Sequence, residues 1–139
     1  MNEYLELKKR QQKEINALPI KFAFSNEQFK KAMHELGLKE DDYDKIYKLG
    51  GTGGFYRRTD SKLILDTFKR HHSELEEGMK SEEFAYQAFR YELNNHEFSY
   101  TCDDTDALVA LDVKRKDLET NKALRNALER AKQEIWDQM

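Results

Sequence analysis

The chain concentrates its backbone breakers in two places, and this most constrains how it can fold. Four of the six glycines lie together in Gly50-Gly51-Thr52-Gly53-Gly54, and the only proline is Pro19. Glycine and proline mark turns and loops, so the long stretches without them favour helices and strands joined by short connections. The sequence shows no internal repeat and no low-complexity linker. It therefore predicts a single domain over residues 1–139.

The composition is that of a folded protein with a heavily charged surface. Charged residues make up 37% of the chain and hydrophobic residues 38%, while the net charge is only −3. A disordered chain would have fewer aromatic residues than the 12% found here and a larger net charge. No apolar run reaches the ~18 residues of a membrane span, and the N-terminus lacks the apolar core of a secretion signal. We expect a cytoplasmic protein without a membrane partner.

Hydrophobic periodicity and turn residues predict six helices and four short strands. The expected helices are residues 3–17, 25–37, 60–78, 81–95, 103–111 and 117–138. The expected strands are residues 20–24, 45–49, 55–58 and 98–101. Together they predict an α+β fold, in which a small antiparallel sheet of three to four strands, with a Gly-rich hairpin, packs with several helices. The first and last helices are the long ones.

The helix that begins after Ser25 has the clearest start signal. Ser25 and Gln28 form a capping box, and Phe24 and Phe29 occupy the positions of a hydrophobic staple. Gly37 then provides a left-handed cap at the C-terminus of the helix.

The two C-terminal helices each carry an apolar stripe. In residues 81–95 the expected buried positions are Ala85, Ala88, Phe89 and either Glu92 or Leu93. In residues 117–138 they are Leu124, Leu128, Ala131 and Ile135. The second stripe is narrow, so it packs either on the surface of the domain or on a partner helix. The second case would make the protein a homodimer.

The glycine cluster suggests a binding site. Glycine lets backbone N–H groups approach phosphate oxygens closely, and guanidinium groups match phosphate geometry. The candidate ligand- or partner-binding residues of this segment are Gly51, Gly53, Gly54, Tyr56, Arg57 and Arg58. Neither a Walker loop nor a GxGxxG motif is present. The alternative is a flexible hairpin whose second strand ends in solvated arginines.

Histidine and acidic residues suggest a second site near residue 96. His96 and Glu97 are candidate partner-binding residues, and Glu92 lies one helical turn before His96. With Asp103 and Asp104 they could form a metal or acid–base site, although no metal-binding motif is present. The alternative is a set of half-buried helix histidines that includes His71 and His72. We expect no metal and no cofactor.

Cys102 is a poor candidate nucleophile, because the negative charges of Asp103 and Asp104 disfavour its thiolate. We expect it to be a small buried strand residue. We therefore assign no catalytic residue.

Several segments give the chain a family resemblance. They are residues 22–29, the GGTGGFYRRTDS stretch of residues 50–61, residues 89–98 and residues 104–111. With the polar N-terminal helix that ends at Pro19, they resemble an uncharacterised family of small proteins encoded by Gram-positive bacteria, their phages and conjugative elements. The resemblance covers residues 1–138. It implies no catalytic residues, but it implies an accessory role, such as inhibition of a host defence system.

Three functions follow as hypotheses. The first is a non-enzymatic accessory protein that binds a host protein or sequesters a small phosphate-bearing ligand. The second is a metal-dependent phosphodiesterase or nuclease that uses Glu92, His96 and one of the acidic residues. The third is a nucleic-acid-binding regulator, which the slightly negative net charge makes less favoured.

Overall fold

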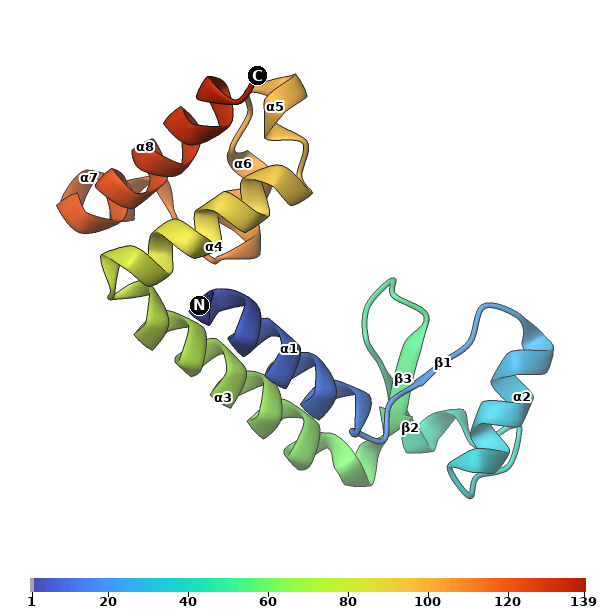
Figure 1. Ribbon diagram of the computed structural model, residues 1–139. Helices are drawn as coiled ribbons and strands as arrows, with labels where there is room; N and C mark the ends of the chain where they lie inside the picture. Colours follow the sequence, from blue (N-terminus) through green and yellow to red (C-terminus); the bar gives the residue numbers. More distant parts are fainter. Residues whose placement is uncertain (1) are drawn as a thin grey trace. The chain divides into compact units, whose positions relative to one another are not determined.

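The computed structural model describes residues 2–139, which form eight α-helices, two short 3-10 helices and one three-stranded antiparallel sheet (Figure 1). The helices are α1 (Glu3–Asn16), α2 (Asn26–Glu35), α3 (Ser61–Met79), α4 (Glu82–Asn95), α5 (Phe98–Thr101), α6 (Thr105–Ala110), α7 (Arg115–Thr120) and α8 (Lys122–Asp137). The 3-10 helices are η1 (Tyr43–Lys45) and η2 (Arg58–Asp60). The strands are β1 (Lys21–Phe22), β2 (Ile46–Lys48) and β3 (Gly54–Arg57). The expected α+β class is confirmed.

The chain divides into two compact units. Unit 1 comprises the residues up to Arg10 together with His71–Met139, and unit 2 comprises Gln11–Arg70. Helices α1 and α3 contribute residues to both units. The single domain stays a prediction, because compactness does not show whether the units unfold together.

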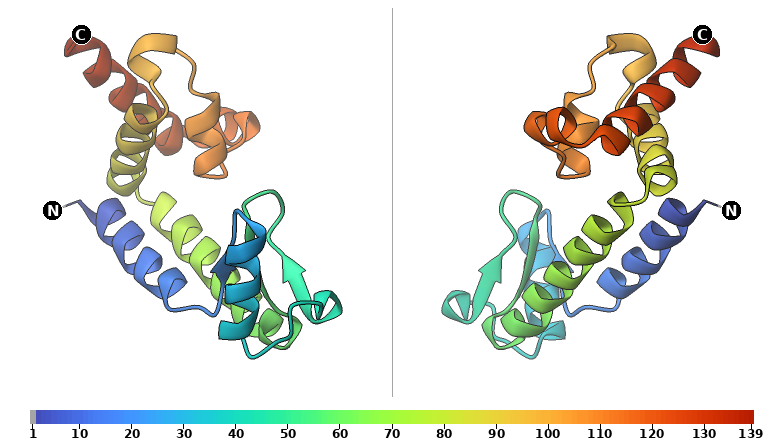
Figure 2. Two further views of the ribbon diagram at one scale, coloured as in Figure 1. Left: turned by 90° about the vertical axis from the view of Figure 1, so that its right-hand side faces the viewer. Right: turned by 90° about the vertical axis from the view of Figure 1, so that its left-hand side faces the viewer.

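Unit 2 contains the sheet, in the order β1-β3-β2. The antiparallel pairs are Lys21 with Phe55 and Phe22 with Gly54 for β1, and Ile46 with Arg57, Tyr47 with Tyr56 and Lys48 with Phe55 for β2. The expected hairpin around the glycine cluster is confirmed, and its loop of residues 49–53 extends beyond the paired strands (Figures 1 and 2). The Leu49 N–H closes the loop by donating to the Gly54 carbonyl at 2.8 Å.

Helix α2 begins at the predicted N-cap Ser25 and ends before the predicted Gly37, but the predicted capping box is incomplete, because the Gln28 side chain bonds the N–H of Phe24 and not that of Ser25. The Ser25 Oγ accepts a hydrogen bond from the Gln28 N–H at 3.2 Å, and the Gln28 Oε1 accepts one from the Phe24 N–H at 2.7 Å. Gly37 has a φ of +75°, and the Leu38 N–H donates to the carbonyl five residues earlier at 2.9 Å. This is the six-to-one bond of a Schellman motif.

The expected hydrophobic staple between Phe24 and Phe29 is wrong. The Phe24 side chain is 77% exposed, and its ring lies beside Gly53. Phe29 instead packs against Phe55, with ring centroids 5.0 Å apart, and stacks on Tyr43. The buried core of unit 2 consists of Ala32, Met33, Leu36, Ile46 and Phe55. Phe29 gains more contact by joining this core than by pairing with its neighbour along the chain.

Helix α4 provides the central face of unit 1. It begins at the N-cap Ser81, whose Oγ accepts a hydrogen bond from the Phe84 N–H at 3.3 Å. All of its expected core positions are buried, and this includes both Glu92 and Leu93. Helix α8 packs against α4 (Figure 1). The buried cluster of unit 1 draws its residues mainly from α4, α6 and α8.

The expected helix over residues 117–138 is two helices, α7 and α8. Asn121 separates them because its backbone is extended and its Oδ1 accepts a hydrogen bond from the Leu124 N–H at 3.0 Å, as an N-cap does. The expected stripe of Leu124, Leu128, Ala131 and Ile135 is buried inside unit 1. The stripe therefore has its partner within the chain, and the homodimer stays a prediction without that support.

The expected strand over residues 98–101 is wrong, because these residues form α5. Glu97 before it and Cys102 after it both adopt left-handed backbone conformations, with φ of 60° and 55°. Phe98 is buried while Tyr100 is 88% exposed. So short a pattern fits one helical turn as well as a strand. Cys102 is exposed, so the expectation of a buried strand cysteine is also wrong.

Candidate functional site

The glycine cluster lines a small pocket of unit 2, which we call the hairpin pocket. Its volume is about 280 Å³. Its wall consists of Ala23, Phe29, Lys48, Gly50, Gly51, Gly53, Gly54 and Phe55. The predicted residues Gly51, Gly53 and Gly54 therefore share one site. Lys48 is the charged member of a wall whose other side chains are apolar, which suits an apolar group better than a phosphate.

Two exposed phenylalanine rings lie against the hairpin. Phe24 is 77% exposed and Phe22 53% exposed. A Cβ atom at Gly53 would lie 2.7 Å from the Phe24 Cε1, and one at Gly54 would lie 2.9 Å from the Phe22 Cε1. Glycine at these two positions thus lets the loop backbone approach both rings. This role differs from the phosphate cradle that the sequence suggested.

Arg57 lies at the opposite end of β3 from the hairpin pocket. The strand begins at Gly54 and ends at Arg57, which places their backbones about 10 Å apart. The Arg57 guanidinium donates to the Asp60 carboxylate at 2.8 Å and to the Leu36 carbonyl at 3.3 Å. The structure does not bring this arginine to the glycine loop. Its contacts instead connect β3 to the C-terminus of α2.

Arg58 and Tyr56 also have their contacts within unit 2. The Arg58 Nε donates to the Ile46 carbonyl at 3.2 Å, and its guanidinium lies 4.5 Å from the centre of the Tyr47 ring. Tyr56 is only 5% exposed and packs beside Tyr47. The Tyr56 ring therefore offers no open face for stacking on a base. Among the sequence-predicted residues of this segment, the glycines are the ones at the pocket.

Around residue 96 the structure builds a polar cluster on a buried carboxylate. The Glu92 side chain is only 3% exposed, and its Oε2 lies 3.4 Å from the His96 Nε2. Its Oε1 accepts hydrogen bonds from the Tyr4 hydroxyl at 2.5 Å and from the Lys8 Nζ at 3.3 Å. These four residues form what we call the Glu92 cluster. Glu97 lies outside it, because Glu97 is exposed and its carbonyl accepts from the first turn of α5.

Tyr4 and Lys8 both donate to the buried carboxylate of Glu92, and Lys8 supplies the opposite charge. Burial, reinforced by the hydrogen bond and negative charge of Glu92, raises the pKa of Tyr4 far above its usual range, so the hydroxyl stays a donor. The Lys8 ammonium also lies over the Tyr91 ring, 5.2 Å from its centre. The Oε1 of Glu92 thus faces two protein donors, and its Oε2 lies beside the His96 ring. Among residues 2–139, the groups of three His, Cys, Asp or Glu side chains that are close enough to hold one ion do not include Glu92.

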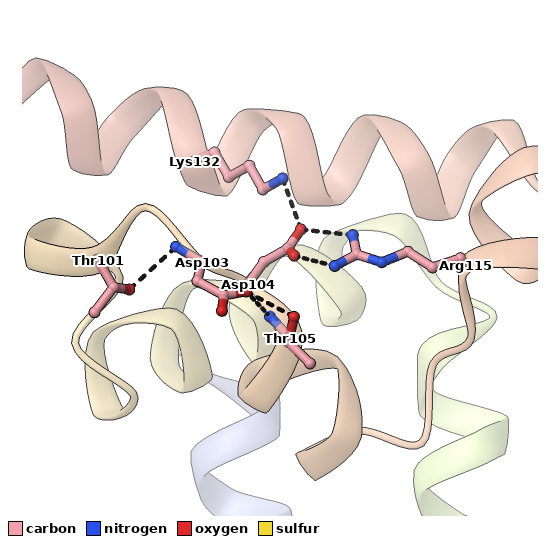
Figure 3. A network of polar contacts seen from close by, with 6 residues as sticks. All are labelled: Thr101, Asp103, Asp104, Thr105, Arg115 and Lys132. Atoms are coloured by element: carbon pink, nitrogen blue, oxygen red, sulfur yellow. Dashed lines mark hydrogen bonds and ion pairs between the residues drawn. The ribbon is translucent and has the colours of Figure 1, made fainter.

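Asp103 and Asp104 belong to a different network, shown in Figure 3. Asp104 is buried, and its two oxygens accept from the Arg115 guanidinium at 3.1 and 2.5 Å, while the Lys132 Nζ lies 2.7 Å away. Burial alone would raise the pKa of Asp104, but the hydrogen bonds from Arg115 and Lys132 outweigh burial and lower it. Asp104 therefore links the start of α6 to α7 and α8.

The two phenylalanines at the hairpin are the functional candidates that sequence reasoning missed. Phe22 ends β1, where it pairs with Gly54, and Phe24 lies in the bend between β1 and α2. The staple pattern paired Phe24 with Phe29. The signal that could have corrected it was the glycine cluster, because glycines accept an aromatic ring against their backbone.

Within residues 2–139 no helix combines the length and the apolar character that crossing a membrane requires. The sequence profile of a family of unknown function (DUF7659) matches residues 3–134. No curated protein and no solved structure matches the chain.

Proposed function

The chain belongs to this family of unknown function, and we propose that it is a non-enzymatic binding protein that holds another protein through the hairpin of unit 2. The observation that carries the proposal is the pair of exposed rings, Phe22 and Phe24, that lie against Gly54 and Gly53 of the hairpin. Aromatic side chains, phenylalanine included, dominate the energetics of protein interfaces because each buries a large apolar area. Exposed apolar groups that are gathered in this way mark interaction sites.

A protein partner fits this site better than a phosphate-bearing ligand. Phe29 and Phe55 contribute apolar surface to the pocket, and Lys48 supplies one positive charge. Arg57 and Arg58 are engaged elsewhere in unit 2. A side chain of the partner would enter the pocket while the exposed rings cover apolar surface on that partner. On the resemblance described above, the partner is a host protein whose action the binding blocks.

The glycines contribute to this function by shaping the surface. Gly53 and Gly54 carry no side chains that would separate the rings from the hairpin, so Phe24 and Phe22 lie directly against its backbone. A surface that is already formed loses little conformational entropy on binding. The same hairpin therefore serves a structural role in unit 2 and a recognition role at its surface.

The test is capture of partners from an extract of a Gram-positive host by the immobilised chain, quantified by mass spectrometry. The double variant F22A/F24A should lose the specific partner by roughly 30-fold or more, because an aromatic hot spot contributes about 2 kcal/mol. The captured protein is then purified, and its affinity for each variant is measured by isothermal titration calorimetry.

The matched control is Tyr100→Ala, which removes a ring that is 88% exposed on α5 in unit 1. It should bind the partner as the wild type does. Equal capture by the wild type and F22A/F24A, with both folded by circular dichroism, would sink the proposal. Native mass spectrometry distinguishes a protein partner from a small ligand, because a nucleotide-sized adduct on the chain would favour the ligand-sequestering alternative.

A further inference from the structure

Three metal-ligating side chains converge in unit 1, away from the residues used so far. The His72 Nε2 lies 3.0 Å from the Glu76 Oε1 and 3.4 Å from the Asp112 Oδ2. One donor atom from each of the three residues lies within 4.8 Å of the other two. We call these residues the His72 triad. Each side chain is accessible to solvent, so an ion could reach them.

Local structure brings each of the three side chains to this place. His72 and Glu76 are four residues apart on α3, which puts them on the same helical face. Asp112 follows the end of α6 with a φ of 52°, and the next N–H, of Val113, donates to the Leu108 carbonyl at 2.9 Å. This is a Schellman turn, whose left-handed position is usually occupied by glycine. An aspartate there supplies a carboxylate at some conformational cost.

The distances fit a coordination sphere. Ligand atoms bound to Zn²⁺ at about 2.0–2.1 Å in a tetrahedron lie about 3.3 Å from one another. The two measured separations from His72 bracket that value. One imidazole and two carboxylates are suitable donors for Zn²⁺ and for Mn²⁺. Three protein ligands leave at least one position for water or another ligand, as in catalytic zinc sites.

The charge of the His72 triad and the cavity beside it also favour a bound cation. With a neutral histidine the triad carries two negative charges, and the nearby Lys80 pairs with Glu77 at 2.9 Å. Glu76 and Asp112 also line a cavity of about 280 Å³, so a small molecule could approach an ion held there. From these observations we infer that His72, Glu76 and Asp112 form a binding site for one divalent transition-metal ion. The site is separate from the hairpin and independent of the proposed function.

The experiment is titration of the purified full chain with ZnCl₂ by isothermal titration calorimetry. The wild type should bind one Zn²⁺ per chain, and ¹H–¹⁵N spectra should show the largest imidazole shift at His72. The decisive variant is Asp112→Gly, which removes a ligand while providing the residue that the left-handed turn favours. It should keep the fold and lose Zn²⁺ affinity by more than the roughly 10–100-fold that loss of an outer-shell partner costs.

His72→Gln should produce a loss of the same size. The matched control is His34→Gln, because His34 is an exposed histidine with its Nε2 3.8 Å from the Glu40 Oε1 and no place in a triad. This variant should bind Zn²⁺ as the wild type does. Saturable Zn²⁺ binding that is equal in the wild type, Asp112→Gly and His72→Gln would overturn the inference. Absence of saturable binding by the wild type would overturn it as well, and would leave an ion pair only.

Discussion

At the residue scale, Gly53 combines two constraints that rarely coincide. Its φ of +80° disfavours any side chain, and its Cα faces the Phe24 ring so closely that a Cβ atom would overlap it. Gly51, two residues earlier in the same loop, has neither constraint, since nothing lies within 4 Å of its Cβ position. The two glycines therefore look alike in the sequence and differ in physical role.

We expect Gly53→Ala to lower the free energy of unfolding by about 1–3 kcal/mol, because alanine is strained at positive φ and displaces the ring. Gly51→Ala should leave stability unchanged or raise it slightly, by reducing the freedom of the unfolded chain. Urea unfolding followed by far-UV circular dichroism measures both. Equal effects of the two substitutions would contradict both the backbone strain at Gly53 and its contact with Phe24.

The charge of the buried Asp104 side chain contributes to the stability of unit 1. Asp104→Asn should destabilise the protein by about 2–3 kcal/mol at pH 7, because it removes the charge that satisfies Arg115 and Lys132. Chemical denaturation of both proteins at pH 7 gives this difference directly. An unchanged free energy of unfolding would mean that water replaces the interactions of Asp104 with Arg115 and Lys132 at no cost in stability.

The pH dependence of the stability difference between the wild type and Asp104→Asn tests the role of the Asp104 charge independently. The pKa of Asp104 is lower in the folded than in the unfolded chain, so its ionised form favours folding. That contribution is complete above about pH 5 and is lost as the pH falls through the folded pKa, below about pH 4. The stability difference between the wild type and Asp104→Asn should therefore shrink on acidification, and a constant difference would contradict it.

At the element scale, helices with local start and stop signals were predictable. Ser25 and Ser81 act as N-caps, and Gly37 ends α2, because each interaction lies within a few residues of the chain. The strand predicted at residues 98–101 and the undivided terminal helix were wrong. In both places the deciding contacts are non-local or depend on a single cap, such as that of Asn121.

The features of the candidate site also divide into those that local signals predict and those that only the fold determines. The glycines of the hairpin could be predicted to lie together in one turn, because turn chemistry is local. The strand register places Arg57 away from that loop. Phe24 is exposed because Phe29, and not Phe24, packs against the core. The His72 triad depends on Asp112, which lies about 40 residues along the chain from His72. No pattern near His72 predicts Asp112.

The packing of α8 against α4 gives a prediction for these two elements. Leu128→Ala should cost roughly 2–5 kcal/mol, because Leu128 is buried in the core of unit 1 and its truncation leaves a cavity. Leu65→Ala, at a position that is 53% exposed, should change stability by about 0.5 kcal/mol or less. Thermal and urea unfolding compare the two, and a small effect at Leu128 would exclude α8 from the core.

At the scale of the whole molecule, the two units share helices. Because α1 and α3 each contribute residues to both units, loss of either unit shortens a helix that the other uses. We therefore expect one cooperative transition, as the sequence predicted for a single domain. Trp136 fluorescence reports on unit 1, and far-UV circular dichroism reports on all helices. Coincident curves would agree with this expectation, whereas two separated transitions would show two folding domains.

The exposed Cys102 has a practical consequence for every experiment above. It is the only thiol in the chain, and it stands on the surface after α5. Air oxidation can join two chains through it, so a covalent pair on a sizing column would vanish with reductant and say nothing of quaternary structure. The same atom accepts one maleimide dye or one nitroxide without mutagenesis. A dye placed there could follow partner capture by anisotropy, and a nitroxide placed there could follow Mn²⁺ binding by paramagnetic broadening.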